Sequence, residues 1–380
     1  MTIVYIIDSY GRFSNGTTVT AKRSKEYLEK LGHTIRVVSI DDSKEQGFYQ
    51  LEERNVPIVS YFAKKQHMHF AKPDREILTE AFKDADIIHL FLPFKSSLKA
   101  IKLGKELNIP VTAAFHMQPE HITYNMGLGR FGTPIAWLIY KYLKFKLYNK
   151  VTRVHCPSEF IKNKLVKNNY KNTFHVISNG IQDEFFTEPI RELNPEQYNI
   201  LSIGRYSKEK RQETLLKAVS KSKYKDKIKI TLAGRGPKEK SLKKLAKRLK
   251  LNVDFVFLSR EDLIEKIKES HLYIHPAEAE IEGISALEAI ASGLVPIIAV
   301  SKNSATKQFT ITPESLYKVR DHNELKDKIE YFIENPKRRV ELEEEYRKYM
   351  KRYHIDYSMK MLEKMFKEAI NDHTIKENSK

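Results

Sequence analysis

Short apolar segments alternate with helix-like segments along most of the chain, and this alternation restricts the fold more than any other feature. Residues 3–8, IVYIID, form an apolar run that ends in an acid, as a buried parallel strand does. A polar loop follows, and then a helical pattern over residues 19–31 that stops at Gly32. The next apolar run is HTIRVVSI. A strand, a loop, a helix and a second strand in this order predict a parallel α/β sheet.

The alternation runs through two series, which predicts two domains. The second series starts at YNILSIGRYSKEK, after an acidic segment that contains prolines. A chain of 380 residues is long enough for two cores, since single cores stop growing near about 250–300 residues. We therefore predict two α/β domains that face each other across a cleft. The predicted parts are an N-terminal domain at 1–185, a linker at 186–198, a C-terminal domain at 199–350 and a helical segment at 351–380 that returns to the N-terminal domain.

The composition is that of a globular chain without a membrane span. Hydrophobic residues make up 41% of the chain and charged residues 31%. No apolar run approaches the roughly 20 residues that cross a bilayer, and the N-terminus lacks the features of a signal peptide. The single cysteine, Cys156, excludes an internal disulfide, while His67 and His69 have no third ligand at metal spacing. We therefore expect a cytoplasmic protein without a bound metal.

Positive charge dominates the chain, and one segment combines it with aromatic residues. The net charge is +18, which attracts polyanions such as nucleic acid, an anionic membrane or a phosphorylated substrate. Between His121 and Ser158 the sequence has no Asp or Glu. This segment predicts a helix that docks on an anionic membrane, or alternatively one with a buried aromatic face and solvated lysines. No stacking or groove-reading motif supports nucleic acid. The candidate docking residues are Arg130, Trp137, Lys141, Lys144, Lys146 and Lys150.

The stretch from Pro276 to Gly293, PAEAEIEGISALEAIASG, carries two acids on either side of a glycine. Glu280 and Glu288 flank Gly283, where an apolar strand has ended and a helical pattern begins. An acid in a loop, a glycine at a turn and an acid about one helical turn later suggest a ligand site. The alternative is an ordinary strand, loop and helix with surface glutamates.

A second loop supplies cations for an anionic ligand. Arg205 and Lys210, five residues apart after a predicted strand, can converge on one diphosphate. The backbone N–H groups of Gly283-Ile284, at the helix start, can bind the same group. Glu288 can accept hydrogen bonds from the hydroxyls of a ribose, and Glu280 from those of a sugar. Together these groups suit a nucleotide sugar, whereas the two cations alone would be surface charge in a lysine-rich chain.

The first series offers a candidate site residue at a strand end. His116 ends the run IPVTAAFH, and open α/β sheets keep their ligand sites at the carboxyl ends of strands. The alternative for a single histidine is a structural role. The first loop, SYGRFSNGTT, contains Gly16 but not the G-x-G-x-x-G pattern, so a dinucleotide-binding fingerprint is absent.

These motifs together resemble the family 4 retaining glycosyltransferases, which have the GT-B fold. The second half carries GRYSKEK, LAGRGP and the family's Glu-x7-Glu signature, with Glu280 and Glu288 as its acids. The first half carries Asn15-Gly16, the AFH that ends at His116, and SNGI at 178–181. Within the family the chain looks most similar to enzymes that glycosylate membrane lipids, such as diacylglycerol glucosyltransferases and phosphatidylinositol mannosyltransferases.

The resemblance implies roles for the residues at the phosphate end of a nucleotide-sugar donor. Arg205 and Lys210 would hold the diphosphate and stabilise the charge that develops as it leaves, in place of a metal ion. Glu288 would bind the ribose hydroxyls. Gly16 would let the first loop approach the phosphates and the acceptor.

The resemblance also implies roles at the sugar end. Glu280 would bind the transferred sugar, and His116 would lie against it near the reacting carbon. Retention without an enzymic nucleophile implies front-face attack, in which the leaving phosphate oxygen takes the proton of the acceptor. No general base in the protein is assigned.

The chain departs from the family pattern at four places. Arg211 stands where a glycine is usual, Glu282 where an aromatic residue is usual, and Ala277 where a serine is usual. Ser304-Ala305-Thr306 replaces a glycine pair. Glu282 would add a third acid close to the sugar, where it would change donor preference or else face solvent.

The expected activity is therefore metal-independent, retaining transfer of a hexose to a lipid at the inner face of the cell membrane. UDP-glucose is the expected donor, no cofactor is required, and no nucleic acid is bound. The same site could serve a cell-wall polymer or a capsule precursor. A different class, a polyanion-binding protein with a degenerate catalytic fold, predicts that Glu280→Gln and Lys210→Ala leave function intact.

Overall fold

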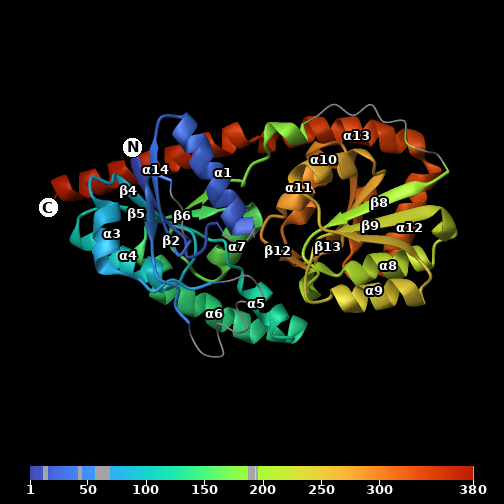
Figure 1. Cartoon of the computed structure of the whole chain (residues 1–380), viewed down its shortest axis with the longest axis horizontal. Helices are drawn as coiled ribbons and strands as arrows, with labels where there is room; N and C mark the ends of the chain where they lie inside the picture. The colour runs from blue at the N-terminus through green and yellow to red at the C-terminus, as the bar shows by residue number, and fades with distance from the viewer. Residues whose placement is uncertain (12–15, 42–44, 56–68, 187–192, 194–195, 380) are drawn as a thin grey trace. The chain divides into compact units, whose positions relative to one another are not determined.

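The computed structural model describes residues 1–379, apart from 12–15, 42–44, 56–68, 187–192 and 194–195 (Figure 1). The chain divides into two compact units. Unit 1 comprises Met1–Pro119, Pro134–Asn179 and Asp356–Lys380, and unit 2 comprises Glu120–Thr133 and Gly180–Ile355.

Unit 1 is built on a parallel sheet. Among the described residues it has seven strands in the order β3-β2-β1-β4-β5-β6-β7. Their bounds are β1 Thr2–Ile6, β2 Thr34–Ser39, β3 Phe48–Gln50, β4 Ile87–Leu90, β5 Val111–Ala114, β6 Arg153–Cys156 and β7 Thr173–Val176. The helices are α1 Gly16–Lys30, α3 Arg75–Phe82, α4 Lys95–Glu106, α6 Thr133–Lys146, α7 Glu159–Lys167 and α14 Ile355–Asn378. The central strand β1 is almost wholly buried, which explains why it reads as a continuous apolar run.

Unit 2 has a second parallel sheet. Its described residues form six strands in the order β10-β9-β8-β11-β13-β15, and β12 pairs with β14 beside it. The strands are β8 Tyr198–Ile203, β9 Ile228–Ala233, β10 Asn252–Val256, β11 Leu272–His275, β12 Ala279–Glu280, β13 Val295–Val300, β14 Asn303–Ser304 and β15 Leu316–Lys318. The helices are α5 Pro119–Asn125, α8 Gln212–Ser220, α9 Glu239–Arg248, α10 Arg260–Lys268, α11 Ile284–Ala291, α12 His322–Glu334 and α13 Pro336–Met350.

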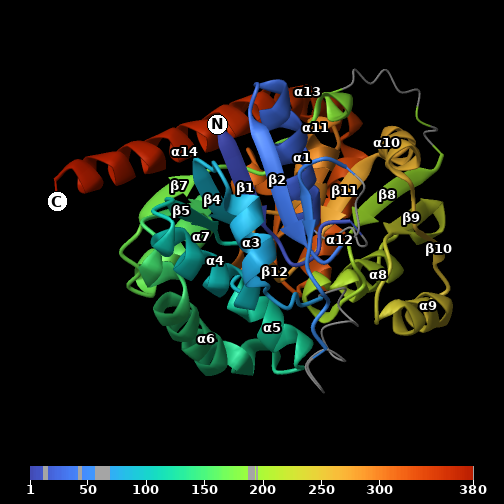
Figure 2. The same ribbon diagram turned by 60° about the vertical axis from the view of Figure 1, so that its left-hand side comes forward.

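The C-terminal helix α14 belongs to unit 1, although the helices before it belong to unit 2. Arg153 on β6 pairs with Glu368 at 2.6 Å and with Asp372 at 2.9 Å. His33 lies 2.9 Å from Glu363. Figures 1 and 2 show α14, in red, running along the unit that contains β4 and β5. The ion pairs attach the end of the chain to the unit in which it began.

The unit boundaries differ from those expected from the sequence. Residues 120–133 and 180–185 fall in unit 2, whereas the sequence analysis placed them in a domain at 1–185. The change at Gly180 has a local cause, because Ile181 exchanges backbone hydrogen bonds of 2.9 Å with Tyr353 and Ile355. Most of the predicted linker at 186–198 lies outside the described residues.

Candidate functional site

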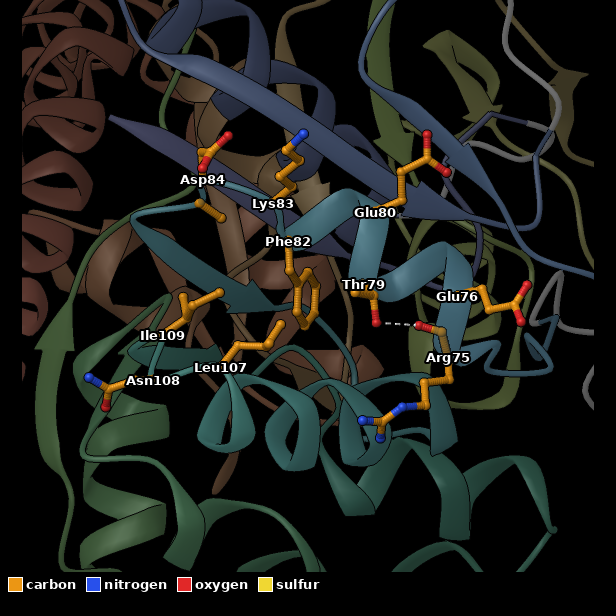
Figure 3. A pocket seen from close by; sticks show the side chains of 11 residues that line it. Arg75, Glu76, Thr79, Glu80, Phe82, Lys83, Asp84, Leu107, Asn108 and Ile109 are labelled. Atoms are coloured by element: carbon orange, nitrogen blue, oxygen red, sulfur yellow. Dashed lines mark hydrogen bonds between the residues drawn. The ribbon is translucent and has the colours of Figure 1, made fainter.

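A hollow of unit 1 lies at the amino-terminal edge of its sheet, where β4 and β5 begin (Figure 3). In Figure 3, Phe82 and Leu107 point toward each other, and charged side chains of both signs surround them. None of the residues predicted to bind a ligand lines this hollow. Its lining residues are Arg75, Glu76, Thr79, Glu80, Phe82, Lys83, Asp84, Ala85, Leu107, Asn108 and Ile109.

The predicted motif loops lie in unit 2, at the carboxyl edge of its own sheet. The strand order of this sheet reverses between β8 and β11. The loop at 204–210 follows β8, and the loop at 276–283 follows β11. Because open α/β sheets bind ligands at such a reversal, the two motifs meet at the expected place for a ligand site.

Two glycines of the LAGRGP motif hold the loop after β9 against the loop after β8. A Cβ atom at Gly234 would lie 2.2 Å from the carbonyl oxygen of Gly204, and one at Gly236 would lie 2.5 Å from that of Tyr206. Both distances are far inside van der Waals contact, so a side chain would push the loops apart. The backbone that carries Arg205 is thereby fixed on both sides.

Lys210 and Glu280, which the sequence assigned to the diphosphate and the sugar, form a direct ion pair. The Nζ atom of Lys210 donates to Oε1 of Glu280, and His275 Nε2 lies 3.3 Å from the same oxygen. Burial raises the pKa of Glu280, but Lys210 and His275 lower it by more, and the net pKa is well below its usual range. Glu280 is therefore an ionised acceptor for hydroxyl groups.

The sequence analysis missed a group of hydrogen-bonded side chains that reaches Glu280 through His275. Tyr273 Oη lies 2.8 Å from His275 Nδ1 and 3.3 Å from the hydroxyl of Ser285 on α11. Burial lowers the pKa of His275, so its ring is neutral near pH 7. The signal was the alternation in LYIH, because residues two apart on a strand point to the same face.

The two signature acids are buried, which contradicts the alternative of surface glutamates. Glu280 and Glu288 are each 7% exposed. Glu288 lies on α11, one turn after Ile284, where that helix begins. Gly283 precedes it with φ +100°, and a Cβ atom there would lie 2.5 Å from Cγ2 of Thr306. Glycine is required because both the backbone angle and the space exclude a side chain.

Arg205 is partly buried at the end of β8, and so is Lys210 in the turn that follows. Burial lowers the pKa of the Arg205 guanidinium, and the carboxylate of Glu209 opposes this shift. Glu209 is itself buried, and its Oε1 accepts a hydrogen bond of 2.6 Å from Ser207. The positions of Arg205 and Lys210 are therefore not those of ordinary surface charges.

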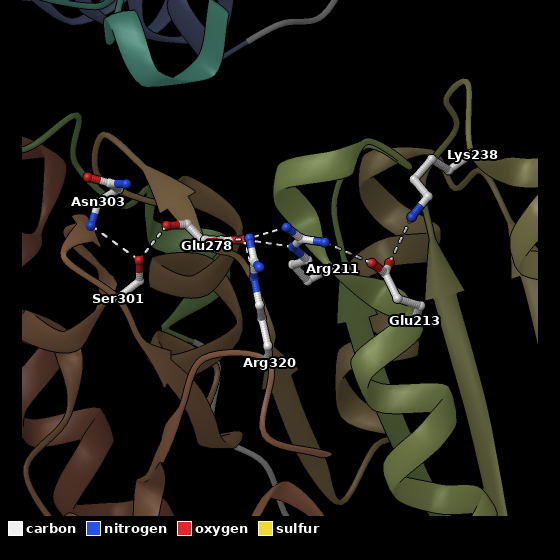
Figure 4. A network of polar contacts seen from close by, with 7 residues as sticks. All are labelled: Arg211, Glu213, Lys238, Glu278, Ser301, Asn303 and Arg320. Carbon is white, nitrogen blue, oxygen red and sulfur yellow. Dashed lines mark hydrogen bonds and ion pairs between the residues drawn. The ribbon is translucent and has the colours of Figure 1, made fainter. Parts of the chain in front are cut away.

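Two arginines converge on Glu278, two residues before Glu280 (Figure 4). Arg211 Nε donates to Glu278 Oε2 at 2.7 Å, and Arg320 donates to both carboxylate oxygens at 2.7 to 2.9 Å. Burial raises the pKa of Glu278, but Arg320, Tyr124 and Arg211 together lower it by more. Arg211 has φ +54°, a left-handed conformation that suits the glycine usual at this position. Its ion pair with Glu278 offsets that strain.

His116 and Gly16 belong to unit 1. His116 follows β5 and is buried, with its ring stacked 5.9 Å from Phe91 and edge-on at 5.3 Å to His155. Burial and His155 lower its pKa well below the usual range, so the imidazole is neutral. Gly16 begins α1 and is exposed. Asn15, its predicted partner, lies outside the described residues.

Sequence comparison decides the family. A profile described as Glycosyltransferase Family 4 matches residues 14–185, and one described as Glycosyl transferases group 1 matches residues 183–349. The chain belongs to the family 4 glycosyltransferases. It is a nucleotide-sugar-dependent transferase, as the motifs at Lys210 and Glu280 predicted.

The relatives of this glycosyltransferase include glycolipid-forming enzymes. It is 28% identical over 316 residues to alpha-monoglucosyldiacylglycerol synthase of Streptococcus pneumoniae, covering 79% of this chain and 71% of that one. It is 22% identical over 329 residues to the enzyme of the same name in Acholeplasma laidlawii, covering 78% and 80%.

Solved structures share the fold along the whole chain. Sucrose-phosphate synthase from Thermosynechococcus elongatus matches with a TM-score of 0.77 and 17% identity, covering 98% of this chain and 99% of that one. HepE from Anabaena, solved with UDP, matches with a TM-score of 0.74 and 15% identity, covering 97% and 100%. The predicted fold class, an α/β protein of the GT-B type, is confirmed.

Glu282 is a departure from the family pattern that does not face solvent. The residue is only 2% exposed. Its charge also contributes, after burial and Tyr349, to raising the pKa of Tyr353. The glycosyltransferase therefore encloses a third acid in the segment that holds Glu278 and Glu280.

The predicted docking residues of unit 1 lie on and just after α6. Trp137 is 48% exposed, with the Nζ atom of Lys141 3.7 Å from its ring centre. Lys146 and Lys150 are exposed, and Lys144 is partly exposed. Arg130 lies in a short helical turn of unit 2, Gly129–Gly132.

The other face of α6 is buried through Ala136, Tyr140 and Leu143. The helix therefore combines a buried aromatic residue, as expected for an ordinary helix packed on the core, with exposed aromatic residues, as expected for a membrane-docking helix. No helix among the described residues has the length and hydropathy to cross a membrane.

Metal-ligating side chains do not gather in the described part of the chain. No group of three or more His, Cys, Asp or Glu side chains there could hold a metal ion. His69 Nδ1 lies 3.0 Å from Glu53, and His67 lies outside the described residues.

Proposed function

We propose that this glycosyltransferase moves a hexose from a nucleotide sugar, UDP-glucose first among the candidates, to a membrane lipid. Diacylglycerol or a glycosyl-diacylglycerol is the proposed acceptor. The relatives from Streptococcus pneumoniae and Acholeplasma laidlawii are named as alpha-monoglucosyldiacylglycerol synthases, and the neighbour HepE was solved with UDP. These names support both halves of the proposal.

The buried ion pair of Lys210 and Glu280 carries the proposal for the donor. A lysine needs an anion when it is buried, and Glu280 supplies one within this unit. A donor diphosphate is a stronger anion and would draw the ammonium group toward itself. Glu280 would then be released to accept hydrogen bonds from the sugar, while His275 keeps its carboxylate oriented.

The proposed reaction keeps the configuration of the sugar and uses no metal. Arg205 and Lys210 would stabilise the charge on the leaving diphosphate, which is the task of a metal ion in other transferases. The bond between the anomeric carbon and the phosphate oxygen breaks as the acceptor oxygen attacks from the same face. The departing phosphate oxygen takes the proton of that hydroxyl, so Glu280 serves as a hydrogen-bond acceptor and not as a nucleophile.

A donor screen tests the chemistry. Purified enzyme is incubated with each UDP-, GDP- and ADP-sugar in the presence of extracted membrane lipids and EDTA, and the anomer of the product is assigned by NMR. We expect turnover of one UDP-hexose with the α configuration retained. Lys210→Ala should lower kcat by about 100-fold or more, as expected for losing a group that binds the leaving charge. The exposed Lys217→Ala is the matched control.

Three outcomes would contradict this part. Turnover of no nucleotide sugar would refute the enzyme reading, and an inverted product would refute front-face attack. If EDTA abolishes the activity and added Mg²⁺ restores it, the metal-free mechanism is refuted.

The exposed stripe on α6 supports a membrane acceptor. Ile135, Leu138, Tyr142 and Phe145 recur at helical spacing and are all exposed, with Phe145 at 71%. Lysines lie beside this stripe, and an apolar row flanked by lysines suits the surface of an anionic bilayer. The helix would lie in the plane of the interface on the cytoplasmic face.

Vesicle flotation tests the membrane proposal. We expect the enzyme to float with vesicles that contain phosphatidylglycerol and to remain in solution with phosphatidylcholine alone. The double variant Leu138→Ser with Phe145→Ser should bind at least about tenfold more weakly, since each buried side chain contributes more than 1 kcal/mol. Val166→Ser, another exposed apolar residue of unit 1, is the control. If the wild type fails to float with the vesicles that contain phosphatidylglycerol, this result would favour a soluble or polymeric acceptor.

A further inference from the structure

The segment at 120–133 comes from the first half of the sequence but forms part of unit 2. The phenol of Tyr124, on α5, hydrogen-bonds with the side chains of Glu278 and Asn303. A Cβ atom at Gly127 would lie 3.1 Å from Nζ of Lys208. The segment therefore contacts both loops that flank the reversal of strand order, one after β8 and one after β11.

His121, on the same helix, lies among the charged groups of the candidate site. Its imidazole interacts electrostatically with Glu209, Glu280 and Lys210. The residue is partly exposed, but its Nε2 atom is buried and has no hydrogen-bond partner among the described residues. A buried ring nitrogen without a partner is costly, and most such atoms in folded proteins are paired. A ligand hydroxyl would supply this missing partner.

The imidazole of His121 is suited to a neutral, hydroxyl-bearing ligand. Burial lowers its pKa; Glu209 and Glu280 oppose this shift and Lys210 adds to it, with a net lowering. A neutral imidazole has one donor and one acceptor nitrogen. A sugar hydroxyl can both donate and accept, so it matches Nε2 in either tautomer.

We propose that His121 is a specificity-determining residue of the donor-sugar subsite, where its Nε2 hydrogen-bonds one hydroxyl of the hexose that Glu280 also binds. This inference rests on the proposed function and adds to it a subsite wall from α5. Tyr124 is the positioning residue of that wall, because its bond to Glu278 holds α5 against the segment that carries Glu280. A single neutral hydrogen bond predicts an effect of about tenfold in affinity.

Calorimetry with UDP and with UDP-glucose separates the subsite from the rest of the donor site. We expect His121→Ala to bind UDP as the wild type does and to bind UDP-glucose about tenfold more weakly. His121→Gln, which retains an amide group, should recover at least part of that loss. His322→Ala, at the start of α12, should match the wild type for both ligands. Equal melting temperatures of the variants, measured beside these titrations, exclude misfolding as the cause.

Deoxy analogues of UDP-glucose identify the hydroxyl. The wild type should discriminate about tenfold against the analogue that lacks the contacted hydroxyl, and His121→Ala should not distinguish that analogue from UDP-glucose. Equal UDP-glucose affinity of the wild type and His121→Ala would overturn this inference and leave the proposed function standing. Equal losses for UDP and UDP-glucose in His121→Ala would overturn it as well, because they indicate a structural role. A wild type that binds no nucleotide sugar would overturn the proposed function itself.

Discussion

Replacing Gly283 with alanine tests how the backbone builds the site between Glu280 and Glu288. The backbone at Gly283 has φ +100°, where a side chain costs about 1–2 kcal/mol. The new Cβ atom would also lie 2.5 Å from Cγ2 of Thr306, which is fully buried. Overpacking of this kind costs about 1–3 kcal/mol. The free energy of unfolding should therefore fall by roughly 2–5 kcal/mol, the sum of the two costs.

A second substitution isolates the steric part. Thr306→Ser removes Cγ2 and keeps the hydroxyl, which bonds that of Ser304 at 2.9 Å. Alone it should cost about 1 kcal/mol, the value of one buried methyl group. In its presence, Gly283→Ala should cost only the backbone strain of about 1–2 kcal/mol.

The assay is urea denaturation of the wild type, both single variants and the double variant, followed by circular dichroism. The kcat of each protein is measured in parallel, and we expect Thr306→Ser to restore part of the activity that Gly283→Ala loses. The double-mutant cycle gives the coupling between the two positions. Strictly additive losses, or a cost of Gly283→Ala below about 1 kcal/mol, would refute the claim that contact with Thr306 requires a glycine here.

Further predictions concern the acid at the sugar, a buried histidine and the unusual arginine. Glu280→Gln should lower kcat by about 100-fold or more while UDP still binds, and near-normal turnover would contradict the proposed role of Glu280 at the sugar. Burial lowers the pKa of His155 from 6.5 to about 4, so unfolded chains take up the proton first as the pH falls. The contribution of neutral His155 to the stability of unit 1 is complete above pH 6.5 and should fall by up to about 3 kcal/mol toward pH 4, so the denaturation curves of His155→Gln should depend less on pH. In urea denaturation, the free energy of unfolding of Arg211→Gly should exceed that of Arg211→Ala by about 1 kcal/mol. Both variants lose the ion pair with Glu278, but only glycine relieves the strain of φ +54°. Equal midpoints would contradict that account.

Much of the fold was predictable because it follows from local patterns. Buried parallel strands must be apolar on both faces, so β1 appears in the sequence as the run at 3–8. The LAGRGP motif was also recognisable in the sequence, and the structure adds that Gly234 and Gly236 permit a close approach of two backbone segments. The order of the strands could not be predicted from the sequence, and neither could the assignment of residues 120–133 to unit 2. Both depend on contacts between segments that are distant in the sequence.

The candidate site divides in the same way. Lys210, Glu280 and Glu288 stand in motifs whose spacing is fixed by one loop or one helix turn, so the sequence alone made them candidates. The bond of Glu278 to Arg320 was not predicted, because 42 positions of chain separate the two residues. His121 was also missed, because no motif near it in the sequence indicates an interaction with Glu280.

The sequence by itself determined the two parallel sheets, the glycosyltransferase family and the acids and cations that we propose for the donor site. Those features are local, because side-chain periodicity and short motifs act within a few residues. Only the tertiary structure decided that Lys210 contacts Glu280, that Glu282 is buried and that His121 on α5 interacts electrostatically with Lys210 and Glu280. Burial and ion pairing are properties of the folded surroundings, since they depend on which distant residues exclude water from a charge.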